Sequence, residues 1–164
     1  MKKLLTLLTT TIFLFSHPHT FIDLYPTISG NTFTLKWVFD EMTSNMIMMD
    51  FDEDHDMKLN DKEQKLIHDE AFIHLKEFNF YAHMMVGDKE QSIKKVSNFK
   101  TYFENNRVVY QFDIELPKKL NAIEFYDPDL YIAFVLKQES IKSDKKFQLE
   151  EINNDYYFGY KVAL

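Results

Sequence analysis

The sequence of 164 residues contains no cysteine, three glycines and four prolines. Without cysteine the chain has no disulfide, no thiolate metal site, no cysteine nucleophile and no lipoprotein anchor. Three glycines are too few to favour the glycine-rich phosphate loops of nucleotide-binding folds, and the low glycine and proline counts exclude collagen-like and low-complexity chains. A chain of this length with 45% hydrophobic residues is long enough to bury the core of one domain.

Positive charge is also scarce. Lys and Arg number 19 against 26 Asp and Glu, which gives a net charge of -7. An acidic chain without a basic cluster argues against nucleic acid or an anionic lipid surface as partner, and cations are its more natural ligands. The motifs G-x-S-x-G and H-E-x-x-H are absent as well, and we expect no enzymatic activity.

The one long, mostly hydrophobic run lies at the N-terminus, where a short basic start precedes residues 4–15. A spanning helix needs about 20 apolar residues, so this run is too short for one, but it fits the hydrophobic part of a secretory signal. Ser16 is a small residue that predicts cleavage before His17. The sequence therefore predicts a signal peptide over 1–16 and a single exported periplasmic domain over 17–164, with no membrane insertion after cleavage. The alternative is an uncleaved N-terminal anchor.

Cleavage at this point would create the terminus His17-Pro18-His19. A terminal histidine offers its α-amine and an imidazole nitrogen to one metal ion, and His19 lies on the same face if the segment is extended. Pro18 has no amide N–H, so a site built on deprotonated amides is unavailable. The remaining nitrogen donors suit zinc, nickel or copper. Asp23 lies two pleats further on and is expected to ligate the metal or to orient an imidazole.

Further candidate ligands lie later in the chain. His83 stands among apolar residues of an expected strand, either as a hydrogen-bonded core histidine or as another metal ligand. Asp127 and Asp129 occupy a turn and are candidates for the same site, although turn residues need no such explanation. His68 and His74 are separated by about 600° of helical rotation and are interpreted as surface residues.

Hydrophobic periodicity predicts an α+β domain with a mostly antiparallel β-sheet or sandwich. Two helices, 41–49 and 61–78, are expected after the second strand, with the acidic loop 50–60 between them. This forms a helix–acidic loop–helix insertion. Asn105-Asn106 is the expected hairpin turn. The expected strands are 19–26, 32–39, 80–86, 99–103, 108–116, 123–126, 130–136, 147–152 and 156–162.

Residues 52–63 match the spacing of an EF-hand calcium loop, whose ligands occupy positions 1, 3, 5, 7, 9 and 12. The residues at these positions are Asp52, Asp54, Asp56, Lys58 (through its backbone carbonyl), Asn60 and Glu63. Leu59 at position 8 would anchor the loop to the core. Position 6 normally needs glycine for a left-handed turn, and Met57 there costs about 1 kcal/mol or more. The spacing predicts bound Ca²⁺; the alternative is a solvated loop that caps the next helix, with Asp61 at the N-terminus of that helix.

The block His17-Pro18-His19-Thr20-Phe21-Ile22-Asp23 after a signal peptide resembles the start of a bacterial periplasmic family, catalogued as domain of unknown function 1007 and described as the periplasmic component of an uncharacterised transport system. Similar blocks are 37–41, the acidic loop before Leu59, 75–83 and 126–134. Members commonly have glycine at position 6 of the acidic loop. The family is often found beside membrane permeases of the nickel/cobalt type, and the resemblance implies a role in zinc or nickel supply.

Together these features predict a periplasmic accessory protein that delivers Zn²⁺ or Ni²⁺ to an inner-membrane permease and binds Ca²⁺ in its acidic loop. The alternative is a calcium-stabilised interaction module of the envelope without a transition-metal role. A third hypothesis, an enzyme with copper on the terminal histidine, lacks a substrate surface in the sequence.

Overall fold

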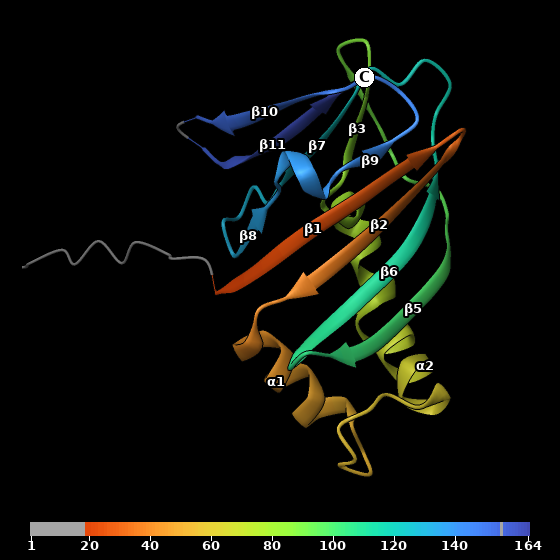
Figure 1. Ribbon diagram of the computed structural model, residues 1–164, viewed down its shortest axis with the longest axis vertical. Helices are drawn as coiled ribbons and strands as arrows, with labels where there is room; N and C mark the ends of the chain where they lie inside the picture. Colours follow the sequence, from red (N-terminus) through yellow and green to blue (C-terminus); the bar gives the residue numbers. More distant parts are fainter. Residues whose placement is uncertain (1–18, 155) are drawn as a thin grey trace, which may run out of the picture.

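The computed structural model describes residues 19–154 and 156–164 (Figure 1). The predicted signal peptide and His17 lie outside the described residues. Two β-sheets and their flanking helices form the described structure, so the predicted α+β class with mostly antiparallel sheets is confirmed. Among the residues that the structure describes, no helix has the length and apolar character that crossing a membrane requires.

The larger sheet, sheet A, has the strand order β5-β6-β2-β1-β8, and β9 also pairs with β1. The pairings of β1 with β8 and with β9 are parallel, and the other pairings of sheet A are antiparallel. The strands are β1 Thr20–Ser29, β2 Thr32–Phe39, β5 Val96–Glu104, β6 Arg107–Glu115, β8 Ile132–Val135 and β9 Lys142–Ser143.

The smaller sheet, sheet B, has the order β10-β11-β7-β3-β4 and is antiparallel throughout. Its strands are β3 His83–Val86, β4 Lys89–Gln91, β7 Ala122–Tyr126, β10 Gln148–Asn153 and β11 Phe158–Ala163. Gly159 makes the β11–β7 pairing possible, because a Cβ there would meet the backbone oxygen of Phe125 at 2.1 Å.

Alternation of apolar and polar residues sets which face of sheet A is buried. On β2, the large apolar residues Phe33, Leu35, Trp37 and Phe39 alternate along the strand and are all buried. Trp37 packs edge-on against Phe112 of β6, with ring centroids 5.5 Å apart. The helices cover this apolar face, and the opposite face of β1, β2 and β6 is turned to the viewer in Figure 1.

The main departure from the predicted helices lies between Glu70 and His83. The elements are α1 Glu41–Phe51, α2 Asp61–Glu70, the 3-10 segment η1 Phe72–Tyr81 and the short η2 Gln138–Ser140. The single helix expected over 61–78 was wrong, because α2 ends at Glu70 and Ala71 leaves helical geometry with φ -125°. The strand expected from Phe80 begins only at His83.

Burial of aromatic side chains explains this break. Phe72 and Phe80 are buried, and both rings contact Phe112 of β6. Asn79, Phe80 and Tyr81 have positive φ, which neither a helix nor a strand uses. Burying a phenylalanine side chain stabilises the folded state by about 1.5–3 kcal/mol, which is enough to offset the backbone cost of one residue in the left-handed conformation.

Asp40 fixes the start of α1 against β1. Its carboxylate accepts hydrogen bonds from the backbone N–H of Thr43 (2.9 Å), as an N-cap, and from that of Phe21 (2.8 Å) on β1. Burial alone would raise the pKa of the Asp40 carboxyl, but these hydrogen bonds and one from the Thr43 hydroxyl lower the pKa below its usual value. The charged form therefore stabilises the junction between sheet A and the acidic loop's first helix.

Candidate functional site

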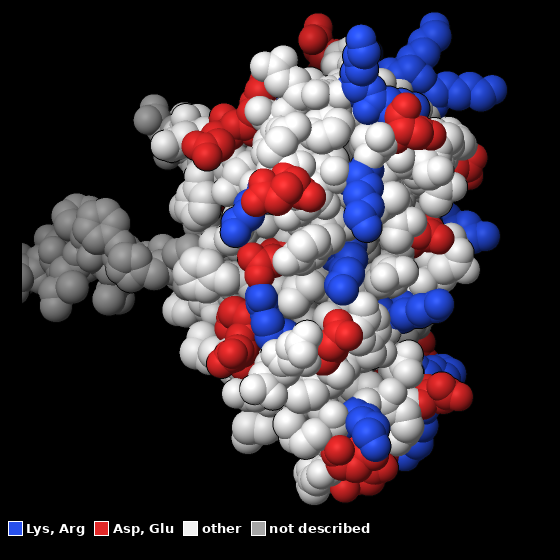
Figure 2. Space-filling model, in the orientation of Figure 1, with Lys and Arg blue, Asp and Glu red and all other residues white. Residues whose placement is uncertain are grey.

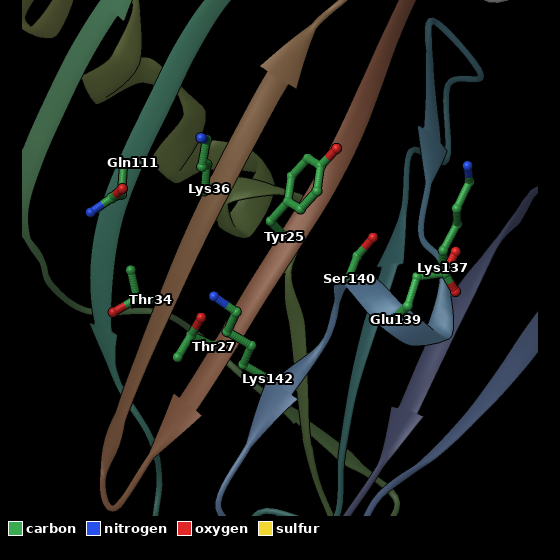
Figure 3. A pocket seen from close by; sticks show the side chains of 9 residues that line it. All are labelled: Tyr25, Thr27, Thr34, Lys36, Gln111, Lys137, Glu139, Ser140 and Lys142. Carbon is green, nitrogen blue, oxygen red and sulfur yellow. The ribbon is translucent and has the colours of Figure 1, made fainter.

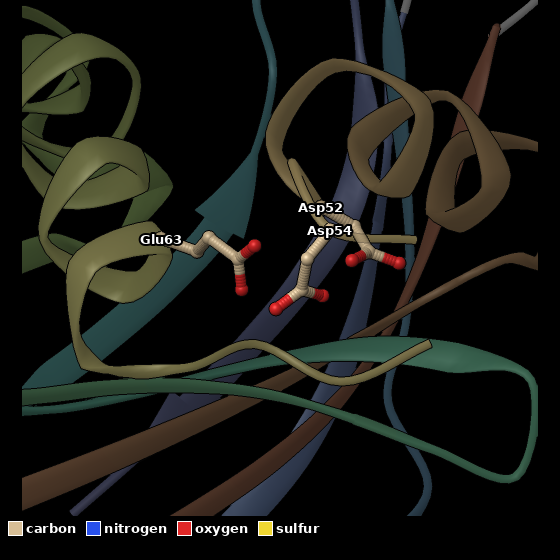
Figure 4. Close-up of side chains that lie close together, drawn as sticks. All are labelled: Asp52, Asp54 and Glu63. Atoms are coloured by element: carbon tan, nitrogen blue, oxygen red, sulfur yellow. The ribbon is translucent and has the colours of Figure 1, made fainter. Parts of the chain in front are cut away.

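The acidic loop lies between the end of α1 and the start of α2, and its carboxylates converge. Oxygen atoms of Asp52, Asp54 and Glu63 lie within 4.8 Å of one another. In Figure 4 the two aspartates come from the chain that leaves α1, and Glu63 reaches toward them from the first turn of α2. Leu59 is buried and holds the far side of the loop on the core. Among the described residues, these three carboxylates are the one group of three or more histidine or acidic side chains close enough to share an ion.

Two of the three carboxylates are buried, with Asp52 3% and Glu63 1% exposed. Asp52 accepts hydrogen bonds from the backbone N–H groups of Asp56 (3.3 Å) and Met57 (3.0 Å). Glu63 accepts from those of Glu53 (2.9 Å) and Asn60 (2.8 Å). These bonds hold the carboxylates in place and leave lone pairs for a cation, since a carboxylate offers about four acceptor positions.

No cationic side chain of the described residues pairs with Asp52, Asp54 or Glu63 within salt-bridge distance. Neighbouring lysines pair elsewhere: Lys62 with Glu53, and Lys58 with Asp56 at 3.7 Å. Burying charge without a partner is costly, and the backbone N–H groups compensate only part of that cost. The geometry of the loop therefore suits an added cation.

Two of the predicted calcium ligands make other contacts. Asp56 is exposed and accepts a hydrogen bond from the backbone N–H of Lys58 (2.8 Å). The side chain of Asn60 accepts from the backbone N–H groups of Lys62 and Glu63, so Asn60 is the N-cap of α2 in a capping box with Glu63. Asp61, which the alternative interpretation puts at the N-terminus of this helix, is the first residue of α2.

Met57 adopts the left-handed conformation that position 6 of a calcium loop requires, with φ 61°. Its side chain is exposed, so the methionine gains little packing in return for the backbone cost. His55, two residues earlier, has φ 57° and is exposed as well.

The structure disperses the described candidates for a transition-metal site. His19 is exposed at the start of sheet A, and its backbone N–H donates to the carbonyl of Tyr131 (2.8 Å). Asp23 forms a salt bridge with Arg107 of β6 (2.6 Å). Arg107 also donates to the carbonyls of Val38 (2.8 Å) and Phe39. Asp23 thus holds an arginine that the sequence analysis did not identify, because the two residues lie 84 positions apart.

His83 is buried in sheet B with both ring nitrogens engaged. Nδ1 lies 2.9 Å from Oε1 of Glu90, and Nε2 lies 3.3 Å from the carbonyl oxygen of Tyr126. The ring also stacks on that of Tyr126, with centroids 3.9 Å apart. Of the two alternatives left open for His83, these contacts fit the hydrogen-bonded core histidine.

Asp127 organises the turn before β8. It is buried and accepts hydrogen bonds from the backbone N–H groups of Asp129 (2.9 Å), Tyr131 (3.1 Å) and Ile132 (2.9 Å). Burial raises the pKa of the nearby Tyr81 to about 12, and the charges of Asp127 and Asp129 add to the rise. Tyr81 therefore stays protonated at neutral pH and does not supply a phenolate ligand.

A second feature lies on the open face of sheet A, where a hollow of about 620 Å³ is bordered by η2. Tyr25 on β1, Lys36 on β2, Lys142 on β9 and Lys137 beside η2 line it (Figure 3). None of these lysines forms a salt bridge within the described residues, and the Lys36 ammonium lies 5.9 Å from the centre of the Tyr25 ring. Figure 2 shows basic side chains along this face, interspersed with acidic ones. The sequence carried no signal for this hollow, because strand pairing alone brings the lysines together.

The family model described as "Protein of unknown function (DUF1007)" matches residues 3–156. The chain belongs to the DUF1007 family. This confirms the resemblance found in the sequence, and the DUF1007 match includes the acidic loop and all of sheet A. No curated protein matches the chain, and no solved structure matches it.

Proposed function

We propose that this DUF1007 protein is a metal-binding protein of the bacterial cell envelope whose loop 52–63 binds one Ca²⁺ ion. The observation that carries the proposal is the convergence of Asp52, Asp54 and Glu63, two of which are buried and have no cationic partner among the described residues. The backbone carbonyl of Lys58 and water would complete the coordination. Enzymatic activity is not part of the proposal.

The donor set favours Ca²⁺ over other ions. All the converging donors are carboxylate oxygens. Hard cations such as Ca²⁺ prefer these oxygen ligands, whereas zinc, nickel and copper also bind well to nitrogen or sulfur ligands. Mg²⁺ demands near-octahedral geometry and releases its water reluctantly, whereas Ca²⁺ accepts six to eight oxygens in flexible arrangements. Asp52 and Asp54 lie in the chain that leaves α1, and Glu63 lies in the first turn of α2, so the ligands come from separate segments and fit the flexible case.

Isothermal titration calorimetry of the purified protein tests this proposal. We expect one Ca²⁺ per chain. Asp54→Asn removes one ligand charge at an exposed position, where the carboxylate accepts a hydrogen bond from the backbone N–H of Asp56 (3.2 Å) that the asparagine oxygen can also accept. The substitution should weaken Ca²⁺ binding at least about tenfold, because even the loss of an outer-shell partner weakens metal binding by about 10–100-fold. Asp69→Asn is the matched control, because Asp69 is exposed on α2 and pairs with Lys65. Absence of binding, or equal affinity of wild type and Asp54→Asn, contradicts the proposal.

A second role rests on the N-terminus and on the family resemblance: supply of Zn²⁺ or Ni²⁺ to an inner-membrane permease from the periplasm. Asp23, His83 and Asp127 all hold structural partners, so we now assign the binding to His17 and His19 with the terminal amine. The exposure of His19 at the edge of the fold supports this role, because a donor protein must reach its acceptor.

Zinc and nickel titrations of the exported protein separate this role from the calcium-stabilised interaction module. His19→Ala and an added residue before His17 should each weaken binding, whereas His74→Ala, an exposed histidine on η1, should not. Affinity should fall below about pH 6, since imidazole must be neutral to bind a metal. If neither ion binds, the interaction-module interpretation replaces the transport role.

A further inference from the structure

Helix α1 exposes three large thioether side chains. Met42, Met46 and Met49 are 59%, 49% and 80% exposed, whereas Met48 is buried in the core. At 100° per residue, the spacings of four and seven residues place the three exposed methionines within about 60° of one another around the helix. We call these three residues the thioether stripe.

Packing does not explain the thioether stripe. The buried positions of α1 are Thr43, Ser44 and Met48, so the helix is attached to the core by another face. Four of the eight methionines of the chain fall between residues 42 and 49, and three of these point away from the core. Exposed clusters of large apolar side chains usually mark a binding site.

The chemistry of the stripe favours a soft metal ion. Thioethers bind Cu(I), and because the chain has no cysteine, methionine is its soft-ligand side chain. Along the axis, Met46 lies about 6 Å from Met42 and about 4.5 Å from Met49, by the rise of 1.5 Å per residue. Methionine has a flexible, unbranched side chain, so the outer two sulfur atoms can bend toward the central one.

The surrounding charge favours a cation over an acidic or neutral partner. Between Trp37 and Met57 there is no lysine or arginine, and there are seven carboxylates: Asp40, Glu41, Asp50, Asp52, Glu53, Asp54 and Asp56. Figure 2 shows acidic side chains gathered at the bottom of the view, where the loop after α1 lies. Met49 also lies in the last turn of α1, where the helix dipole is negative and no basic side chain balances it.

From this geometry we propose that Met42, Met46 and Met49 form a Cu(I) site on the surface of α1. The site uses three neutral sulfur donors and the negative field of the neighbouring carboxylates. It shares no ligand with the calcium loop or with the N-terminal histidines, and it does not depend on the function proposed for either.

Anaerobic titration with Cu(I) against a chromophoric Cu(I) chelator tests the site in the exported protein. The wild-type protein should withdraw one Cu(I) ion per chain from the chelator. The triple variant Met42→Leu, Met46→Leu, Met49→Leu keeps the apolar surface and the helix propensity, so circular dichroism should be unchanged. The Cu(I) affinity of the triple variant should fall at least about tenfold. Mutating even a residue that only hydrogen-bonds to a metal ligand weakens metal binding by about 10–100-fold, and this variant removes the ligands themselves. Met57→Leu, at an exposed methionine outside α1, is the matched control and should bind Cu(I) as wild type does.

Methyl NMR of ¹³C-labelled methionine gives an independent readout. Cu(I) should shift the methyl resonances of Met42, Met46 and Met49, while those of the buried Met48 and Met84 should stay in place. Equal affinity in the triple variant would assign the copper to another site, such as the N-terminal histidines, and would overturn the proposal. Absence of Cu(I) binding in wild type would overturn it too, and would leave the stripe as an apolar docking surface.

Discussion

Replacing Glu63 by glutamine tests the acidic loop most directly, because the substitution keeps the size of the side chain and removes its charge. Glu63 is almost completely buried and accepts two backbone hydrogen bonds, from Glu53 and Asn60. Its oxygens also lie within 4.8 Å of those of Asp52 and Asp54. The variant therefore changes both the hydrogen bonding of the loop and its negative field.

Without Ca²⁺ these two changes oppose each other. A glutamine NH₂ group would face one of the backbone N–H donors, and losing that charge-assisted bond costs about 1.5–3 kcal/mol. Removing one carboxylate relieves its repulsion with Asp52 and with Asp54, which is about 3.5 kcal/mol per pair for unit charges 4.8 Å apart at an effective dielectric constant of about 20. The relieved repulsion exceeds the cost of the lost bond, so the free energy of unfolding of the ion-free variant should be no lower than that of wild type.

With Ca²⁺ the two proteins should differ clearly. Binding to the folded state alone stabilises by about 2.7 kcal/mol when the ion is present at about 100 times Kd. For a domain of this size about 1 kcal/mol shifts the Tm by roughly 2–4 °C, so the wild-type Tm should rise by roughly 5–11 °C. Glu63→Gln should abolish the rise, because position 12 supplies the bidentate ligand.

Differential scanning calorimetry with and without millimolar Ca²⁺ measures both effects. Glu53→Gln is the matched control: the side chain is exposed, pairs with Lys62, and its loss should cost less than about 1 kcal/mol while keeping the full Ca²⁺ response. Two results would contradict Ca²⁺ binding through Glu63: a wild-type Tm that does not change with Ca²⁺, or a Glu63→Gln Tm that rises as much as that of wild type.

Three further predictions concern the loop, sheet B and the start of α1. Met57→Gly should raise the free energy of unfolding by about 1 kcal/mol and tighten Ca²⁺ binding, since φ 61° suits glycine and the side chain is exposed; unchanged or lower stability in urea titration would contradict this. Gly159→Ala should lower stability by about 1–3 kcal/mol or more, because its Cβ would meet the oxygen of Phe125, and a Tm equal to wild type would argue against the β11–β7 register. Wild type should be more stable than Asp40→Asn at about pH 7. Because the pKa of Asp40 is lowered in the folded protein, this advantage should disappear as the pH falls below 3.8, the usual pKa of an aspartate, and through the folded pKa. Urea titrations from about pH 7 to about pH 3 measure the difference in stability between the two proteins. A difference that does not change with pH would exclude the charge of Asp40 as its source.

Several elements followed from the sequence because their causes are local. Alternation of apolar residues from Phe33 to Phe39 was enough to identify β2 and its buried face. Asn105 and Asn106 lie between β5 and β6 as the predicted turn, both with the positive φ that asparagine tolerates. The left-handed backbone of Met57 and the burial of Leu59 also agree with the spacing of the loop.

Other elements had no local signal. Strands β4 and β9 were missed because Lys89–Gln91 and Lys142–Ser143 are short and polar, and they exist only through pairing with β3 and β1. The helix predicted over 61–78 was broken because Phe72 and Phe80 are drawn into the core beside β6, a contact that helical periodicity within the segment does not encode.

The spacing of the acidic loop and the family to which the chain belongs could both be recognised in the sequence. Which carboxylates remain free to bind an ion depends on how the chain folds. Asp23 lies opposite Arg107 because β1, β2 and β6 are neighbours in sheet A, and the salt bridge engages its charge. Asp52 and Glu63 are buried together because α1 and α2 fold onto the same core, and within the described part of the chain neither has a cationic partner. A carboxylate is free to bind an ion only if no cationic side chain lies close to it. That distance is set by how the chain folds and not by the spacing of residues in the sequence.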